Sequence, residues 1–304
     1  MHFSGAGGVS TLHSNDGSSE SSGRTLPRRA AGALAAAFRA LTGTQLAGRA
    51  ATVFPDDVFL TSYPRSGNTW ARFLIANLLY PQEATTFRNI ESRVAEIYFN
   101  PDHRLRRLRR PRVLKSHEAF DPNYPRVIYV VRDPRDVAVS LYHHAMKWRN
   151  ISENYPLEEF VPRFVAAEFE RPSGSWGDNA GSWLAMRQGS STFLLLRYED
   201  MLAEPSAELR TIVTFLKSRG FATLDDTNEN LARVVELSSV ERMRLLEIRD
   251  AGRYPQLKQT RRDKPFIRNA QVGEWRTALS ARSARLIEQA WGPTMERLGY
   301  ARSI

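Results

Sequence analysis

Cysteine is absent from the 304-residue sequence, which excludes disulfide bonds, thiolate metal sites and a cysteine nucleophile. Histidine is scarce, with six residues, and the only adjacent pair is His143 and His144. These two would point in different directions on a helix, so we expect no metal centre. No apolar run reaches the roughly 20 residues that a membrane-spanning helix needs. Together these absences predict a cytoplasmic protein without a transmembrane segment.

Acidic residues are outnumbered, since 33 Asp and Glu against 43 Lys and Arg leave a formal charge of +10. This excess of positive charge favours anionic partners, such as anionic substrates, nucleotides, nucleic acid or membrane surfaces, but does not indicate which of them binds. A hydrophobic content of 42% in a chain of this length is sufficient for a sizeable core.

The first 50 residues form an extension of unusual composition. Residues 1–27 are rich in Gly, Ser, Thr and Asn and predict disorder, whereas residues 28–54 contain helix-forming Ala and Leu interrupted by Arg39. We therefore expect residues 1–50 to be disordered or loosely helical. A twin-Arg export signal or an Arg-rich organelle transit peptide remains the alternative to a soluble extension.

Residues 57–80 organise the rest of the chain. A short apolar run at 58–60 predicts a strand, and apolar residues at helical spacing after Thr69 predict a helix. The loop between them, YPRSGNTW at 63–70, supplies small hydrogen-bonding side chains, a glycine and Arg65 ahead of a helix N-terminus, which favours a bound phosphate. A plain turn with a Ser or Thr cap is the alternative. An ATP-binding loop fits less well because the sequence lacks its Gly-Lys pair.

Strand-like and helical patterns alternate along most of the chain. Residues 113–114, 127–131 and 192–198 are typical of buried strands, and the pattern from 228 onward is helical. We predict an α/β fold: a single domain, residues 51–304, with a central parallel sheet flanked by helices, similar to P-loop kinases, and a helical C-terminal part. Residues 82–112 look polar and irregular, and the basic run at 104–112 suits a solvated surface better than a nucleic-acid patch.

Four strand ends carry polar or cationic groups, and in a parallel sheet these ends meet at one edge. At this point the sequence resembles the cytosolic-type sulfotransferase family. Five segments carry the resemblance in the family's order: residues 63–70, 115–117 (KSH), 129–140 (YVVRDPRDVAVS), 198–201 (YEDM), and 266–268 with 273–276 (FIR and GEWR). The match extends from about residue 55 to 298.

The resemblance implies a donor, 3′-phosphoadenosine 5′-phosphosulfate (PAPS), and in-line transfer of its sulfuryl group without a metal. Its first loop would hold the 5′-phosphosulfate, and the segment at 129–140 the 3′-phosphate. The donor site would comprise Arg65, Ser66, Gly67, Asn68, Thr69, Trp70, Arg132, Ser140, Tyr198, Arg268, Asn269 and Ala270. Two positions depart from the family's pattern, since Arg65 replaces a usual Lys, and Asn269-Ala270 replaces a usual Lys-Gly.

Three residues are the candidates for catalysis. His117, with an ordinary pKa of about 6.5, would accept the proton of the acceptor hydroxyl, while Lys115 and Arg65 would stabilise the leaving phosphate. A lone histidine after a strand is often structural, and Glu118 is the alternative base. Trp70 and Tyr198, expected at the adenine, would otherwise be core aromatics.

Two other functions remain open. A nucleotide or small-molecule kinase would need an acidic magnesium ligand at a strand end, which only Asp133 or Asp136 offers. A nucleic-acid-binding module would use the basic segments at 104–112 and 258–268. For partners we expect a small-molecule, lipid or sugar hydroxyl acceptor, or an amine, and no nucleic acid; a homodimer is left open. The acceptor should contact residues within 82–110, 142–180 and 245–265.

Overall fold

The computed structural model describes residues 45–46, 51–170, 173–252, 254–258 and 260–303. Most of the predicted extension, residues 1–50, therefore lies outside the described residues. At its end, strands β1 (Gln45–Leu46) and β2 (Thr52–Val53) pair antiparallel.

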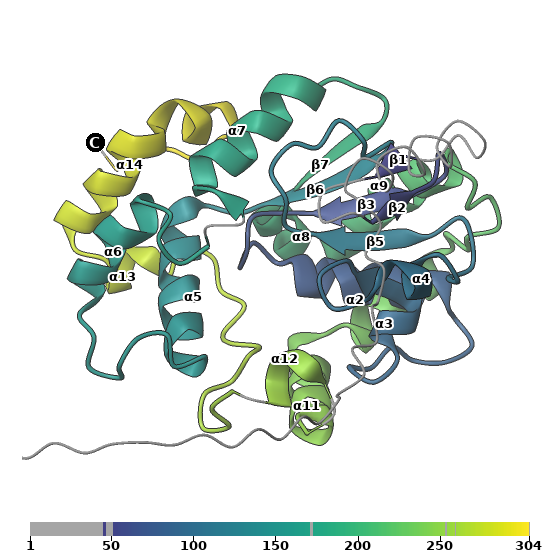
Figure 1. Ribbon diagram of the computed structural model, residues 1–304, viewed down its shortest axis with the longest axis horizontal. Coiled ribbons are helices and arrows are strands. Elements are labelled where there is room, and N and C mark those ends of the chain that lie inside the picture. Colours follow the sequence, from purple (N-terminus) through teal and green to yellow (C-terminus); the bar gives the residue numbers. More distant parts are fainter. Residues whose placement is uncertain (1–44, 47–50, 171–172, 253, 259, 304) are drawn as a thin grey trace, which may run out of the picture. The chain divides into compact units, whose positions relative to one another are not determined.

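A five-stranded parallel sheet forms the centre of the domain, as the sequence predicts, in the order β4-β5-β3-β6-β7 (Figure 1). Its strands are β4 (Val94–Glu96), β5 (Val113–Ser116), β3 (Val58–Thr61), β6 (Val127–Val131) and β7 (Phe193–Arg197). The strands are short, and all residues of β3, β5 and β6 are buried. Burial on both faces explains why β6 appears in the sequence as a continuous apolar run.

Two hydrophobic clusters cover the two faces of the sheet. Residues of β3 alternate between them, since Val58 and Leu60 belong to one cluster and Phe59 to the other. Helices α2 (Asn68–Leu79), α9 (Pro205–Lys217) and α10 (Asn228–Leu237) contribute to the first cluster. Helices α5 (Pro134–Lys147), α6 (Leu157–Val165), α7 (Trp176–Arg187) and α14 (Ala281–Arg297) contribute to the second (Figure 1).

Six further helices complete the described part of the chain. They are α3 (Ile90–Arg93), α4 (Asp102–Leu105), α8 (Tyr198–Ala203), α11 (Val240–Asp250), α12 (Pro255–Lys258) and α13 (Trp275–Ala278). The C-terminal part is helical, as predicted. Within the described ranges, every helix is too short or too polar to cross a membrane.

Residues 82–112 are more ordered than the sequence suggests. The polar segment contains α3, the edge strand β4 and α4, and Val94 to Glu96 pair with Val113 to Lys115. The prediction of a solvated basic run is wrong for Arg112, whose buried guanidinium is hydrogen-bonded to both carboxylate oxygens of Asp57 at 2.8 Å. Asp57 thus neutralises the charge of Arg112 inside the fold. A buried guanidinium without such a partner would lower the stability of the fold by about 3–5 kcal/mol.

Candidate active site

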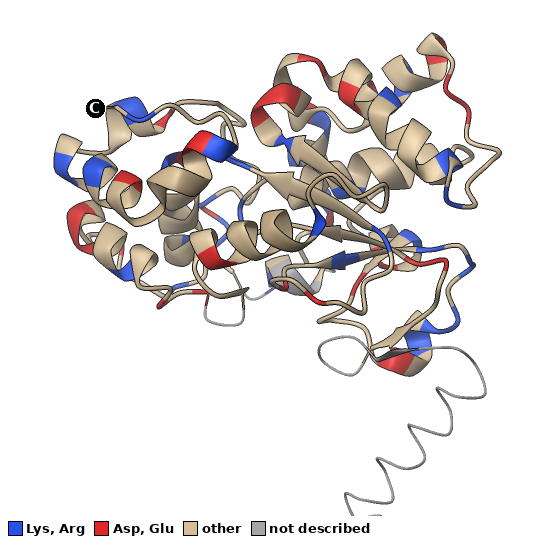
Figure 2. Cartoon of the chain, turned by 90° about the horizontal axis from the view of Figure 1, so that it is seen from above, with Lys and Arg blue, Asp and Glu red and all other residues tan. Residues whose placement is uncertain are grey.

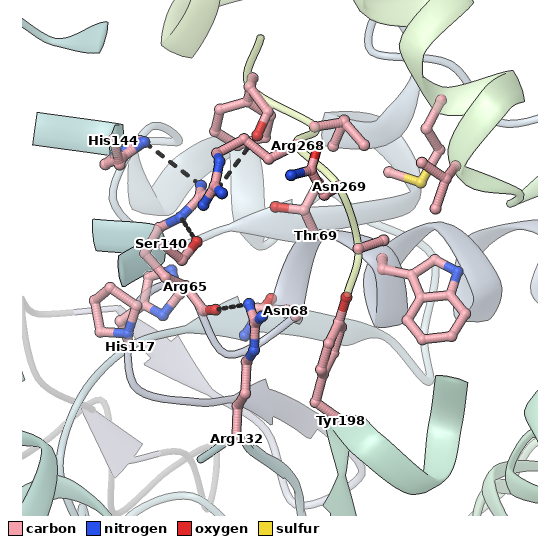
Figure 3. Close-up of a pocket in the computed structure, with 18 of the residues that line it drawn as sticks. Arg65, Asn68, Thr69, His117, Arg132, Ser140, His144, Tyr198, Arg268 and Asn269 are labelled. Carbon is pink, nitrogen blue, oxygen red and sulfur yellow. Dashed lines mark hydrogen bonds between the residues drawn. The ribbon is translucent and has the colours of Figure 1, made fainter. Parts of the chain in front are cut away.

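The carboxyl ends of the strands open into a cavity of about 310 Å³. All catalytic candidates line it, as do all donor-site candidates except Ser66 (Figure 3). They come from the ends of β3, β5, β6 and β7, from the first turns of α2 and α5, and from the segment that follows α12. The register explains this convergence, because Thr61 on β3 is level with Ser116 on β5 and with Tyr129 on β6.

The loop at 63–70 is fixed to the sheet by Asn68. Its side-chain nitrogen, Nδ2, donates to Ser62 Oγ at 3.1 Å and also contacts the carbonyl oxygens of Leu60 and Ser116. Gly67 has a φ of 97°, and a Cβ on it would lie 2.4 Å from Tyr198 Cδ2. Glycine is therefore required where the loop passes the tyrosine ring. The first turn of α2 then presents amide N–H groups that have no carbonyl partner within the helix.

Three buried polar atoms at or beside this loop lack a hydrogen-bond partner within the described part of the chain: Ser66 Oγ, Arg132 Nε and the acceptor Asn68 Oδ1. A hydroxyl and a guanidinium N–H are both donors, so they suit an anion's oxygen atoms. Arg132 is otherwise engaged, because it donates to the carbonyl oxygens of Arg65 and Gln271 and lies 4.5 Å from the centroid of the Tyr198 ring.

Arg65 projects into the centre of the cavity (Figure 3). Its Nε donates to Ser140 Oγ at 3.2 Å, Nη1 contacts His144 Nδ1 at 3.4 Å, and Nη2 donates to the Phe266 carbonyl at 3.3 Å. Burial, with Arg132 and Arg268 nearby, lowers its pKa to about 10. The guanidinium therefore remains charged at neutral pH and is surrounded by neutral acceptors. Such an arrangement favours binding of an anion.

His117 is anchored on several sides. Its amide donates to Tyr98 OH at 2.7 Å, its carbonyl accepts from Asn179 Nδ2 at 3.1 Å, and its ring is stacked with that of Tyr98. Nδ1 lies 2.8 Å from the Ser62 carbonyl oxygen. Because a carbonyl oxygen only accepts, Nδ1 carries the proton and Nε2 keeps its lone pair. Burial and Lys115 hold the pKa of His117 well below its usual range, so the ring is neutral at pH 7 and able to accept a proton.

Lys115 lines the same cavity, but its ammonium is bound to Glu96 Oε2 at 2.8 Å. Both side chains are buried, and burial lowers the pKa of Lys115. Glu96 was not predicted to be a site residue, because strand β4 has only three residues and follows a polar stretch. The Val94-Ala95 pair was the only local signal.

Other residues that line the cavity lie outside the predicted catalytic and donor sites, among them His144, Trp148 and Glu170. All three lie in the 142–180 range expected to contact the acceptor, and Phe99 of the 82–110 range also lines the cavity. Burial raises the pKa of Glu170 to about 7, although Arg65 and Lys115 oppose this shift. Such a side chain can be identified as a site residue only from the fold, which brings it beside the strand ends.

One end of the cavity is apolar. Trp70, Tyr198, Leu202, Val240 and Met243 line it, and the Trp70 and Tyr198 rings meet edge to face with centroids 5.9 Å apart. Each aromatic ring offers a flat face, and the aliphatic neighbours an apolar surrounding, for a planar heterocycle.

The segment at 266–275 forms another wall and is held by carboxylates from two helices. Glu247 of α11 accepts from the amides of Phe266 and Ile267 at 2.6 and 2.9 Å. Asp136 of α5 accepts from the amides of Gly273 and Trp275 at 2.7 and 2.9 Å. Both ends of the segment are thus fixed before any ligand binds.

The middle of this segment contains the three remaining donor-site candidates. Arg268 is paired with Glu274, while Asn269 and Ala270 line the cavity beside it. Ala270 has a φ of 50°, the left-handed conformation that glycine adopts most easily. The backbone therefore retains a glycine-type turn at the position where the sequence has alanine.

The acidic residues that a kinase would use for magnesium are occupied by protein groups. Asp136 binds the two amides described above, and Asp133 caps α5 and pairs with Arg135 at 2.6 Å. Among the described residues, no cluster of three or more His, Cys, Asp or Glu side chains could hold a metal ion.

The basic segments proposed for nucleic acid are partly neutralised by acidic neighbours. Arg110 pairs with Asp56, and Arg261 pairs with Glu153 and Asp263. Basic and acidic residues are interspersed along the helices (Figure 2). This charge pattern does not favour a nucleic-acid interface.

Comparison with known proteins places these features in context. The family described as "Sulfotransferase domain" matches residues 55–299. Sulfotransferase 1B1 of Mus musculus is 28% identical over 242 residues, which cover 73% of this chain and 77% of the relative. Cytosolic sulfotransferase 12 of Arabidopsis thaliana is 27% identical over 254 residues, which cover 77% and 75% of the two chains.

Solved structures with similar folds include two that are described as complexes with PAP. A mouse sulfotransferase superposes with a TM-score of 0.64 at 22% identity, over 80% of this chain and 84% of the other. A retinol dehydratase, bound to androsterone and PAP, gives 0.65 at 20% identity over 80% and 82%. These likenesses support the fold.

Proposed function

The chain belongs to the sulfotransferase domain family, and from this premise we propose that it transfers the sulfuryl group of PAPS to a hydroxyl acceptor in the cytoplasm. One observation carries the proposal. Arg65, Arg132 and the start of α2 line one cavity with hydrogen-bond donors, and His117, whose Nε2 is unprotonated, lines the same cavity.

The residues present fit the donor nucleotide. Ser66 Oγ and Arg132 Nε are buried donors that need an acceptor, and phosphate oxygens would supply it. The apolar end beside Trp70 and Tyr198 suits adenine, while Ser140 and Arg132 would meet the 3′-phosphate. Arg268 would reach the same phosphate only by exchanging its contact with Glu274.

The chemistry follows from the charges in the cavity. As the acceptor oxygen bonds to sulfur, its proton passes to His117 Nε2, and the bond from sulfur to the bridging oxygen breaks. The departing nucleotide takes the electron pair, so negative charge grows on its phosphate. Arg65, and Lys115 in part, would stabilise that charge. Glu96 offsets much of the Lys115 charge, so we assign the larger share to Arg65.

The acceptor is proposed to be a small molecule, lipid alcohol or sugar that enters beside Phe99, Trp148 and Glu170. The two aromatic rings would pack against its carbon skeleton, whereas the carboxyl group of Glu170 would face its polar atoms. An amine acceptor would use the same base.

Calorimetric titration of PAP with and without a chelator, followed by an acceptor screen with radiolabelled PAPS, tests the proposal. We expect binding that a chelator leaves unchanged and transfer of label to at least one hydroxyl compound. Binding of ATP with magnesium in place of PAP would favour a kinase and contradict the proposal.

A further inference from the structure

His144 contacts the guanidinium of Arg65 but has no part in the chemistry described above. It lies on α5 one turn after Ser140, so the two side chains face the same side of the helix. Both contact Arg65, Ser140 through Nε and His144 through Nη1 (Figure 3). The ring of His144 also packs against Trp148 and Phe266, at centroid distances of 5.6 and 6.0 Å.

The proton positions on His144 follow from its partner. A guanidinium only donates hydrogen bonds, so Nδ1 of His144 must accept and the proton resides on Nε2. Burial, with Arg65 beside it, keeps the pKa of His144 well below its usual range. The ring is therefore neutral at pH 7 and serves as a permanent acceptor for Arg65.

Three acceptors determine the plane of the guanidinium. A guanidinium has five N–H groups, and Ser140, His144 and Phe266 take three of them, which leaves two without a partner among the described residues. These contacts are 3.2 to 3.4 Å long, so they orient Arg65 without binding it so tightly that an anion could not compete. The free N–H groups, one on each Nη, are those available to a donor anion.

We propose that His144 is a positioning residue, which orients Arg65 so that its two free N–H groups meet the sulfonate of the donor. The inference rests on the proposed function. It also accounts for the arginine at position 65, where the sulfotransferase pattern usually has lysine. A planar guanidinium must be oriented, whereas the ammonium of a lysine binds from any direction. His144 would thus be required because residue 65 is arginine.

Calorimetric titration of PAPS and of PAP into matched variants tests this role. His144→Phe keeps a ring but loses the acceptor, and it should weaken PAPS binding by about tenfold relative to PAP. His144→Asn places an oxygen where Nδ1 was, and it should restore PAPS binding to within about threefold of the parent. His143→Phe, on the neighbouring residue outside the cavity, is the control and should change neither affinity.

A double-mutant cycle separates positioning from a purely structural role. In an Arg65→Lys background, His144→Phe should cause little further loss of PAPS affinity, since no guanidinium remains to be oriented. Equal losses of PAPS and PAP in His144→Phe, with no rescue by Asn, would overturn the inference. The inference would also be overturned if His144→Phe left PAPS affinity unchanged, or if His144→Phe lowered PAPS affinity equally in the parent and in the Arg65→Lys background. A parent protein that bound neither nucleotide would overturn the proposed function as well.

Discussion

The ammonium of Lys115 and the carboxylate of Glu96, 19 residues apart in the chain, form a buried ion pair 2.8 Å long at the ends of two adjacent strands. Burial favours the neutral form of Lys115, and the charge of Glu96 opposes that effect. Glu96 therefore determines the pH range over which Lys115 remains a cation in the cavity.

Glu96→Gln should make turnover sensitive to alkaline pH. Without the carboxylate, the pKa of Lys115 falls further, so its charge is lost at a lower pH than in the parent. The transfer rate should match the parent's at acidic pH and decline earlier as the pH rises. Rates measured from pH 6 to 10 check this, with Glu83→Gln as the control, because the Glu83 carboxylate is exposed to solvent in its ion pair with Arg93. Identical profiles for Glu96→Gln and the parent would show that the charge of Lys115 is not needed.

His117→Ala should lower turnover by about 10²–10⁴ while PAP binding stays close to that of the parent, because the base acts on the acceptor and not on the nucleotide. In the parent, the low pKa of His117 keeps Nε2 unprotonated at neutral pH. Turnover should therefore be level near pH 7 and fall only as the pH drops through that low pKa.

Glu118→Gln is the comparison for this experiment. We expect it to retain activity within a few-fold of the parent, measured by transfer of radiolabel between pH 5 and 9. A large loss in Glu118→Gln together with an active His117→Ala would move the base to Glu118.

Gly67→Ala should abolish most nucleotide binding. The added Cβ would lie 2.4 Å from the Tyr198 ring, so either the loop or the ring must move. Gly189→Ala is a matched control, because Gly189 also has a positive φ, 82°, but has open space around its Cβ position. The control should lose about 1 kcal/mol of stability and no PAP affinity. Equal PAP affinity in both variants, measured by calorimetry, would show that the loop does not hold the nucleotide.

Arg112→Ala should lower the free energy of unfolding by about 3–5 kcal/mol, since it leaves the buried carboxylate of Asp57 without its partner. Arg110→Ala breaks a neighbouring ion pair that is 44% and 35% exposed, and it should cost about 0–1 kcal/mol. The free energies of unfolding of the two variants can be compared by urea denaturation. Similar midpoints would mean that the Arg112 pair contributes no more than a surface pair.

The parallel sheet and the four strand ends that carry polar or cationic groups could be predicted because they depend on local patterns. A buried strand is a continuous apolar run, and a phosphate-type loop combines glycine with small polar residues over a few positions. Strand β4 was not predicted, because its three residues gain stability from pairing with β5 rather than from their own composition.

The contacts that tune the candidate site join distant segments, so the sequence could not predict them. Arg65 and His144 are 79 residues apart, and only the packing of α5 beside the loop brings them together. Similarly, the basic run ending at Arg112 looks like a solvated surface until Asp57, 55 residues earlier, is placed opposite it. Charge alone does not indicate whether a side chain has a buried partner.

The register of β5 has a consequence for how the chain tolerates insertions. Lys115 faces Glu96 on one side of the sheet, while Ser116 contacts Tyr124 on the other at 2.9 Å. One extra residue between Leu114 and Lys115 would exchange these two sides, because successive side chains of a strand alternate. The ammonium would then enter an aromatic cluster and the hydroxyl would face the carboxylate. Insertions in the surface loops, by contrast, leave this alternation intact, so length variation compatible with activity should be confined to those loops.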